Sequence, residues 1–469
     1  MKESKWTLII LVLLLIVNYA TLQTSLSKAS SSNSVAQLWK FMTNGSVYSS
    51  PVVAGGYIYV ESSYGYGLTA TVYCIDASSG NQVWNYSLDW FYFTPVIDGS
   101  HVYVVSRIYT PSTQSDVTLL YALNATTGTK EWNYTSEYTL FPPVVIGGTV
   151  YIQSTSTPGS GEFIIHALDS STGTEIWNYK SAGDKYFVVD NGYVFMGFGN
   201  SVYAIDAFTG KKLWNYTIDS HGALNVGVSD VVVGQLLYVG TDYTDFYALD
   251  PSSGAKVWNF TTEYPASSSV ESGSFVYVRA DMNIYALDAS TGAIKWTSKF
   301  EDYGNGDPIV SNPYLFYSSE KKLYCLDSST GERKWVYPTE GYAPFVVAGS
   351  RVYLGSAGPQ FLASSAYHNF SVFDAFTGER LWNYTIEGYA SSICVVGERV
   401  YVGSAFASTE SQGQEGSGAL YALEMPLVSS AQPTSLFSLQ LIATVTVVAF
   451  VGIFLLIYFK KRKRKTSVQ

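Results

Sequence analysis

One sequence motif, which we call the phrase, recurs along the chain and indicates the fold. Its first complete copy is Val72-Tyr73-Cys74-Ile75-Asp76-Ala77-Ser78-Ser79-Gly80, followed by Val83-Trp84-Asn85-Tyr86. Two apolar runs flank a polar turn in which Gly follows Asp by four residues and Trp follows Gly by four. Asp can bond the backbone ahead of it and Gly can adopt a positive φ, so the phrase predicts two strands joined by a tight turn. A recurrence of about 40 residues with short strands predicts a propeller or a solenoid. The repeat tryptophans are Trp39, Trp84, Trp132, Trp177, Trp214, Trp258, Trp296, Trp335 and Trp382.

Each repeat predicts four strands, which we call A to D. Strand A is typified by Pro51-Val52-Val53 and strand B by Tyr57-Ile58-Tyr59-Val60, while strands C and D come from the phrase itself. Eight complete units span residues 50–386, and a last A–B–C set runs from about 392 to 424 without a Trp. The strand around Trp39, before the first complete unit, is a strand D that belongs to none of these units. We therefore predict an all-β propeller of nine four-stranded blades closed by that strand, with eight blades as the alternative.

The phrase resembles the repeat of pyrroloquinoline-quinone-type (PQQ-like) β-propellers over about 390 residues. The resemblance implies that the strand D Trp docks between blades and that eight blades are usual. It covers two kinds of protein. One is the quinone-dependent alcohol dehydrogenases, which use the quinone, a calcium ion, an Asp base and often a disulfide of adjacent cysteines. The other is a non-enzymatic branch that binds protein segments and no quinone.

The residues favour the non-enzymatic branch. The three cysteines, Cys74, Cys325 and Cys394, are never adjacent, and no Cys-x-x-Cys-His motif occurs. The four histidines are scattered without metal-ligand spacing, and His166 simply replaces the Tyr of a strand C. The repeated Asp residues could be calcium ligands, but turn capping explains one carboxylate per turn better. We expect no catalytic residue, metal or cofactor, with a quinone-dependent dehydrogenase holding PQQ and calcium as the alternative.

Charge and hydropathy predict a membrane topology. The net charge is −10, which argues against nucleic acid as a partner. Residues 1–32 contain an apolar run typical of a signal peptide, with an uncleaved anchor as the alternative. After residues 33–424 and a linker at 425–435, residues 436–459 are long and apolar enough to span a bilayer. The basic tail, 460–469, should stay cytoplasmic by the positive-inside rule, which places the propeller outside the cell, for example on an archaeal surface.

Loops predict where a ligand binds. The strand B to strand C connections are long in units eight, nine, one, two and three, which are neighbours in a closed ring, and short in units four to seven. Such loops on a rigid scaffold commonly carry function, although drift of exposed loops is the alternative. The connections from strand D to the next strand A carry aromatic residues that could stack on sugars or grip peptide side chains, or pack beneath the loops. The candidates are Trp90, Tyr92, Phe93, Tyr138, Tyr342 and Tyr389.

Eight Asn-x-Ser/Thr sequons are candidate glycosylation sites if the propeller is extracellular. Five of them lie in the strand D phrase, where alternation turns Asn away from Trp. Together these features predict a cell-surface, membrane-anchored propeller that binds extracellular protein or carbohydrate. The sequon residues are Asn44, Asn85, Asn124, Asn133, Asn215, Asn259, Asn369 and Asn383.

Overall fold

The computed structural model describes residues 35–64, 69–89, 93–110, 115–155, 162–182, 187–219, 227–304, 306–339, 341, 343–356, 367–406 and 418–426. Two compact units divide the chain, Met1–Met425 and Pro426–Gln469. The predicted leader at 1–32 and the predicted span and tail at 436–469 lie outside the described residues. Within the described part of the chain, no helix is long and apolar enough to cross a membrane.

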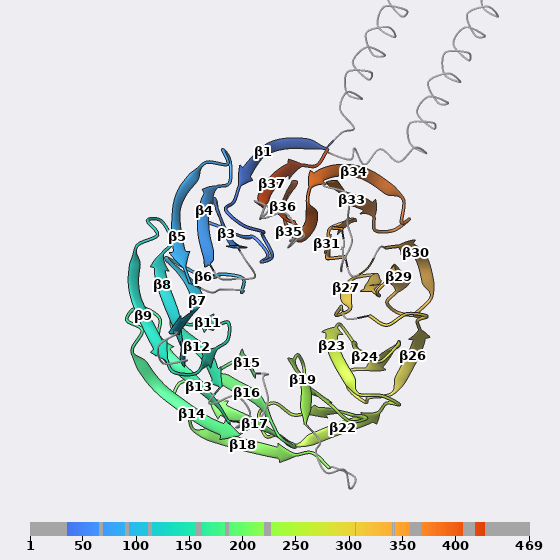
Figure 1. Ribbon diagram of the computed structural model, residues 1–469. Helices are drawn as coiled ribbons and strands as arrows, with labels where there is room; N and C mark the ends of the chain where they lie inside the picture. Colours follow the sequence, from blue (N-terminus) through green and yellow to red (C-terminus); the bar gives the residue numbers. More distant parts are fainter. Residues whose placement is uncertain are drawn as a thin grey trace, which may run out of the picture. The chain divides into compact units, whose positions relative to one another are not determined.

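The first unit is a ring of nine sheets, which we number as blades 1 to 9 (Figure 1). Blades 1 to 4 contain β2 (Val52–Ala54), β3 (Tyr57–Tyr64), β4 (Thr69–Asp76) and β5 (Gln82–Leu88); β6 (Val96–Asp98), β7 (His101–Thr110), β8 (Ser115–Asn124) and β9 (Lys130–Ser136); β10 (Thr139–Leu140), β11 (Val144–Ile146), β12 (Thr149–Thr155), β13 (Glu162–Asp169) and β14 (Glu175–Ala182); and β15 (Phe187–Asp190), β16 (Tyr193–Phe198), β17 (Ser201–Asp206) and β18 (Lys212–Thr217).

The remaining five blades continue in chain order. They contain β19 (Val228–Val233), β20 (Leu237–Thr241), β21 (Asp245–Leu249) and β22 (Lys256–Thr261); β23 (Ala266–Ser272), β24 (Phe275–Ala280), β25 (Asn283–Asp288) and β26 (Ile294–Lys299); β27 (Ile309–Ser311), β28 (Tyr314–Ser318), β29 (Lys322–Asp327) and β30 (Arg333–Pro338); β31 (Phe345–Ala348), β32 (Arg351–Leu354), β33 (Tyr367–Asp374) and β34 (Arg380–Glu387); and β35 (Tyr389–Val396), β36 (Arg399–Ala405), β37 (Ala419–Glu424) and β1 (Ala36–Met42).

Blade 9 joins the two ends of the propeller and confirms the nine-blade prediction. Strand β1 pairs antiparallel with β37, in a register that runs from Ala36 opposite Glu424 to Met42 opposite Ala419. In Figure 1, β1 takes the outermost place beside β37, as strand D does in the other blades. The spare strand around Trp39 therefore covers an edge that would otherwise be unpaired.

Trp residues hold consecutive blades together, as the resemblance implies. The indole Nε1 of Trp84 in blade 1 donates to the Ala125 carbonyl of blade 2 at 2.9 Å. The Trp84 ring lies on Gly128, where an added Cβ would stand 2.5 Å from ring carbon Cδ2 and where φ is +72°. Only Gly permits both the contact and the positive φ. The same Trp–Gly contact is made by Trp39, Trp132, Trp177, Trp214, Trp258, Trp296 and Trp335.

The junction between blades 8 and 9 is built differently. In blade 9, strands C and D are β37 and β1, from opposite ends of the propeller, so no C–D turn joins them. Trp382 of blade 8 therefore meets no turn Gly. The Arg351 guanidinium lies over the Trp382 ring, 4.8 Å from its centroid, and Nη1 of Arg351 pairs with the Glu398 carboxylate of blade 9 at 3.0 Å. A cation–π contact and an ion pair thus stand where the other junctions use a Gly.

The repeated Asp residues cap their own turns. Oδ1 of Asp76 accepts the backbone N–H groups of Ser78 and Ser79 at 3.1 and 2.8 Å, together with both hydroxyls. The Ser78 and Ser79 hydrogen bonds lower the pKa of Asp76 to about 2. The cysteines pack as small core residues: Cys74 and Cys325 are fully buried, and burial raises the pKa of each thiol to about 12.

Candidate functional site

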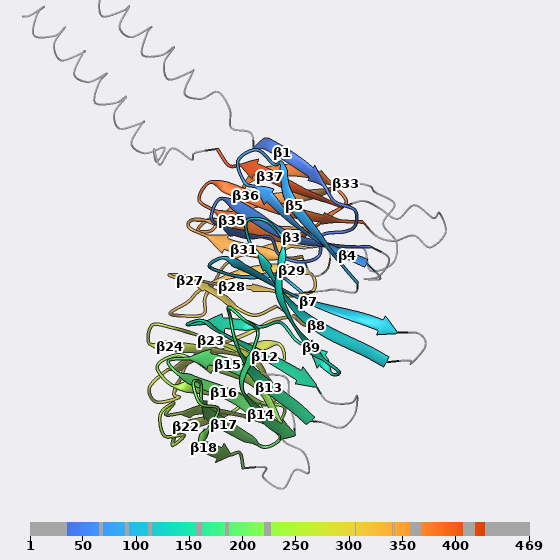
Figure 2. The same cartoon turned by 90° about the vertical axis from the view of Figure 1, so that its left-hand side faces the viewer.

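Extended hairpins rise from one face of the ring in blades 1, 2 and 3 (Figure 2). Strands β7 and β8 of blade 2 have ten residues each, and β3 and β4 of blade 1 have eight each. In blade 5, by contrast, β20 and β21 have five residues each. Blade 8 contributes an eight-residue β33. We call blades 8, 9, 1, 2 and 3 the hairpin sector and blades 4 to 7 the plain sector.

The hairpins correct the sequence prediction in one respect. The B–C connection of blade 2 was expected to be a long loop, but strand β7 continues to Thr110 and β8 begins at Ser115. The antiparallel register is unbroken from His101 opposite Asn124 to Thr110 opposite Ser115. A continued ladder satisfies backbone groups that a loop would leave to solvent, so the insertion projects as a stiff ribbon.

The predicted aromatic residues do not converge among the described residues. Phe93 packs against the apolar cluster shared by blades 1, 2 and 3, and Tyr138 is half-buried in the connection before β10. Tyr389 was expected in a loop but is the first residue of strand β35. Its ring meets His368 edge-on with centroids 6.5 Å apart, and burial raises the pKa of its hydroxyl. Trp90, Tyr92 and Tyr342 lie outside the described residues, and ligand contact stays a prediction for all six.

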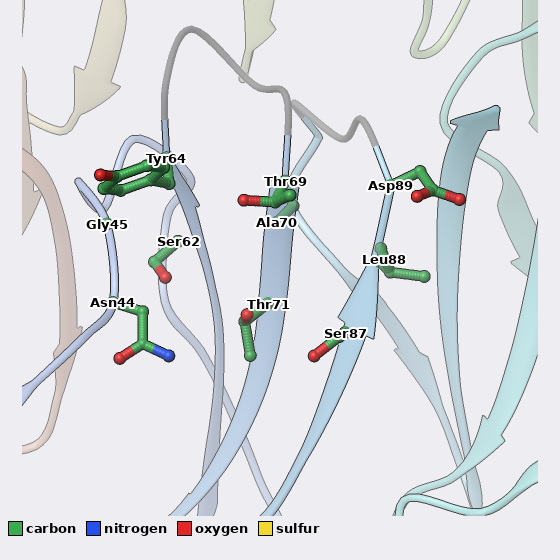
Figure 3. Close-up of a pocket in the computed structure, with 10 residues that line it drawn as sticks. All are labelled: Asn44, Gly45, Ser62, Tyr64, Thr69, Ala70, Thr71, Ser87, Leu88 and Asp89. Carbon is green, nitrogen blue, oxygen red and sulfur yellow. The ribbon is translucent and has the colours of Figure 1, made fainter. Parts of the chain in front are cut away.

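A pocket of about 520 Å³ opens at the top of blade 1, facing the connection from blade 9 (Figure 3). Ser62, Thr71 and Ser87 form one row across β3, β4 and β5, because Ser62 pairs with Thr71 and Thr71 with Ser87. The Ser62 hydroxyl is buried, and no residue that the structure describes is a hydrogen-bond partner for it. Sequence reasoning missed this pocket, although the three hydroxyl residues at matching strand positions were its signal.

A buried carboxylate lies beside the pocket, on the other face of β3. Glu61 is fully buried, and neither of its carboxylate oxygens has a hydrogen-bond partner among the described residues. Burial raises its pKa to about 8, so the side chain is protonated at neutral pH. The corresponding position in blade 4 is Gly197, where Val228 of blade 5 leaves no room for a side chain.

A Ser–His–Glu arrangement lies between blades 2 and 3. Nε2 of His166 is 3.0 Å from the Ser154 hydroxyl, and Nδ1 is 2.7 Å from the Glu175 carboxylate. The Tyr134 hydroxyl of blade 2 also contacts Nδ1 of His166, at 3.0 Å. The order resembles a nucleophilic triad, but the Ser154 side chain is fully buried and cannot meet a substrate. The cluster is therefore an interblade hydrogen-bond network.

Seven of the eight sequon residues have exposed side chains, and the strand D residues among them point outward from the ring. The exception is Asn124, which occupies the Asp position of its turn. Its Oδ1 accepts the N–H groups of Thr126 and Thr127, and its amide donates to Glu131 at 2.8 Å. Glycosylation at Asn124 would disrupt these contacts.

The described residues offer no cluster of side chains suited to a metal ion. No group of three or more His, Cys, Asp or Glu side chains there is arranged to hold a metal ion. The Asp carboxylate of each turn accepts hydrogen bonds within that turn, as at Asp76, and Glu61 lies between blades.

These features define a nine-bladed propeller of PQQ-like repeats with an elaborated face. The family model described as outer membrane protein assembly factor BamB matches residues 25–186 and 199–425. The chain belongs to this BamB-type family of PQQ-like propellers.

Solved structures agree on the fold. BamB from Moraxella catarrhalis is similar over 83% of this chain and 99% of its own, with a TM-score of 0.52 and 15% identity. The quinohemoprotein alcohol dehydrogenase ADHIIG from Pseudomonas putida HK5 is similar over 83% of this chain and 76% of its own, with a TM-score of 0.52 and 16% identity. A europium-containing methanol dehydrogenase is similar over 83% and 93%, with a TM-score of 0.52 and 14% identity. At these identities the likeness concerns the fold alone. No curated protein matches the chain by sequence.

Proposed function

We propose that this protein is a non-enzymatic binding scaffold, anchored in the cell membrane with its propeller outside the cell. The observation that carries the proposal is the hairpin sector, in which the neighbouring blades 1, 2 and 3 extend their B–C hairpins from one face with longer strands than those of the plain sector. Stiff projections on a closed ring offer a preorganised surface, so binding loses less conformational entropy than it would with flexible loops. The ligand is an extracellular protein segment or a glycan.

Two further observations support a binding role over catalysis. The one triad-like cluster in the described residues has a fully buried Ser154. The family match is to the BamB type, and the similarity to dehydrogenases is one of fold. The net charge of −10 disfavours nucleic acid as the ligand.

The experiment removes one projection and leaves the ring intact. Residues 107–118 of blade 2 are replaced by Asn-Gly, which closes a two-residue hairpin between Ser106 and Leu119, a natural pair in the register. The matched control replaces the turn Gly199-Asn200 of blade 4 by the same Asn-Gly. The soluble ectodomain, residues 33–430, and both variants are then used to capture partners from cell-surface extracts. We expect the blade 2 variant to lose partners that the wild type and the control retain. Equal capture by all three would refute a binding role for this sector.

The anchoring part of the proposal has its own test. A tag placed after Gln469 should survive protease added to intact cells, while the propeller is removed, because the Lys460–Lys465 run favours the cytoplasmic side. Loss of the tag together with the propeller would reverse the proposed topology.

A further inference from the structure

The pocket at the top of blade 1 has walls from two separate stretches of the chain. The sheet of blade 1 provides one wall, and the segment around Asn44 and Gly45 provides the other. Ser46 and Ser63 exchange two backbone hydrogen bonds of 3.0 Å, and the Tyr73 hydroxyl accepts the N–H of Asn44 at 3.2 Å. A Cβ at Gly45 would stand 2.3 Å from the Ser63 carbonyl oxygen, so this wall is pressed against β3. The pocket is therefore built and held open by fixed backbone.

Its lining is rich in hydroxyl groups. The row Ser62, Thr71 and Ser87 places one hydroxyl on each of three adjacent strands, about 4.8 Å apart. In blade 2 the equivalent row contains Leu119 in the middle position, between Ser106 and Thr135. The Ser62 hydroxyl is buried and has no hydrogen-bond partner among the described residues, so the members of the row that a ligand can reach are Thr71, which is half-buried, and Ser87, which is exposed.

An aromatic ring and two planar polar groups complete the lining. Tyr64 lies at one end with 44% of its surface exposed, and Asn44 lies at the other end (Figure 3). Asp89 stands at the end of the third strand. A sugar ring offers an apolar C–H face, which can stack on an aromatic ring, and hydroxyl pairs, which a carboxylate or an amide can bind.

Charge narrows the ligand class. Among the described residues that line the pocket there is no Lys, Arg or His, and Asp89 is the single ionisable carboxylate. An anionic ligand would meet repulsion from Asp89 with no compensating cation, and a wholly apolar ligand would leave the hydroxyl row unpaired. A volume of about 520 Å³ lies within the usual range of small-molecule sites.

We propose that this pocket binds a neutral saccharide, held by stacking on Tyr64 and by hydrogen bonds to Thr71, Ser87, Asn44 and Asp89. The proposal rests on the proposed function as a binding scaffold and names a ligand class for one place in the hairpin sector. The saccharide has two sources. It is either a free or cell-surface sugar, or the first residues of a glycan linked to Asn44, which begins the sequon Asn44-Gly45-Ser46.

The first arm of the test uses the full-length chain produced without glycosylation. Glucose, galactose, mannose, N-acetylglucosamine, cellobiose and maltose are each titrated and followed by saturation-transfer NMR. We expect at least one to bind, with an affinity at least tenfold lower in Tyr64→Ala and in Thr71→Val. The matched control is Tyr243→Ala, which removes a similarly exposed Tyr from blade 5. Glucuronate, as a charged counterpart of glucose, should bind more weakly than glucose.

The second arm uses the glycosylated chain. If the Asn44 glycan occupies the pocket, an endoglycosidase should release it several-fold more slowly than the glycan at Asn85, and Tyr64→Ala should abolish that difference. Binding in the first arm alone assigns the pocket to an external sugar, and protection in the second arm assigns it to the chain's own glycan. Absence of both effects, or effects that Tyr64→Ala leaves unchanged, would overturn the proposal. Titrating the sugar into the variant trimmed in blade 2 separates the two ideas, because that variant keeps the pocket even if the sector binds no partner.

Discussion

The hairpin sector and the plain sector are built from the same repeat, yet they differ where strands B and C end. In blade 5, Gly240 and Thr241 end strand β20, and a short turn leads back into β21. In blade 2 the same ladder continues for several more residue pairs before it turns. The Trp–Gly contacts between blades are equally present in both sectors, with one exception at Trp382. The contacts between blades therefore determine the ring, while the ends of strands B and C can change in length and acquire binding groups.

Removing strand β1 should have the largest effect on stability. It tests whether the propeller depends on the β1–β37 pairing of blade 9, which lies in the hairpin sector and has no counterpart in the plain sector. We expect deletion of residues 33–45 to destabilise the whole propeller, since β37 becomes an exposed apolar edge that is prone to aggregate. Thermal melting and light scattering measure both effects. Addition of a peptide with the sequence of residues 33–45 should restore part of the stability. A variant that melts and scatters like the wild type would show that the ring does not need β1.

The next comparison sets Trp39 against Trp214, its counterpart in blade 4. Both are half-buried, and both donate from Nε1 to a carbonyl of the next blade, at 3.3 Å to Ala77 and at 3.1 Å to Pro251. Trp39→Ala and Trp214→Ala should each reduce the free energy of unfolding by about 3 kcal/mol. Chemical denaturation measures this. A much smaller loss at Trp39 would mean that the closing blade is docked more weakly than a mid-ring blade.

Glu61 tests the buried carboxylate that blade 1 has and blade 4 lacks. Its pKa is about 8 in the folded protein and about 4.5 in the unfolded chain, so folding takes up a proton between these pH values. The contribution of Glu61 to the free energy of unfolding is therefore fully present below pH 4.5. It is lost as the pH rises to 8, by up to about 1.4 kcal/mol per pH unit. Glu61→Gln should flatten this part of the stability profile, whereas Glu263→Gln, at an exposed residue, should not. Parallel profiles for Glu61→Gln and wild type would show that Glu61 is charged when buried.

The smallest effect is expected at the one junction without a turn Gly. Arg351→Lys keeps the charge but loses the planar contact with Trp382, and should cost about 1 kcal/mol. The control is Arg380→Lys, because the Arg380 side chain is exposed. Chemical denaturation compares the two. Equal stability of both variants would show that Trp382 docks on blade 9 without help from Arg351.

The fold was predictable from the sequence because its decisive contacts repeat. Asp76, Gly80 and Trp84 lie at spacings that every complete repeat keeps, and counting incomplete units was enough to place β1 beside β37. The pocket was not predictable in this way. It depends on Gly45 lying against Ser63, a contact between the D–A connection and a strand B that no local spacing encodes. The length of the β7–β8 ribbon was also missed, because its polar residues, such as Ser115, are typical of loops as well as of solvated strands.

Closure through β1 has a consequence for how the protein is made. About 380 residues separate β1 from its partner β37, and synthesis at roughly 5–20 residues per second takes about 20–80 seconds to cover them. During that time the first strand has no partner, while the blades behind it assemble one after another. Lys40 of β1, which pairs with Glu387 at 2.7 Å in the closed ring, gives the unpaired strand a charge that disfavours pairing with a wrong edge. Strand β37 is the last propeller strand to be synthesised, and it pairs with β1, the first. A chain interrupted before Ala419 therefore cannot close its ring.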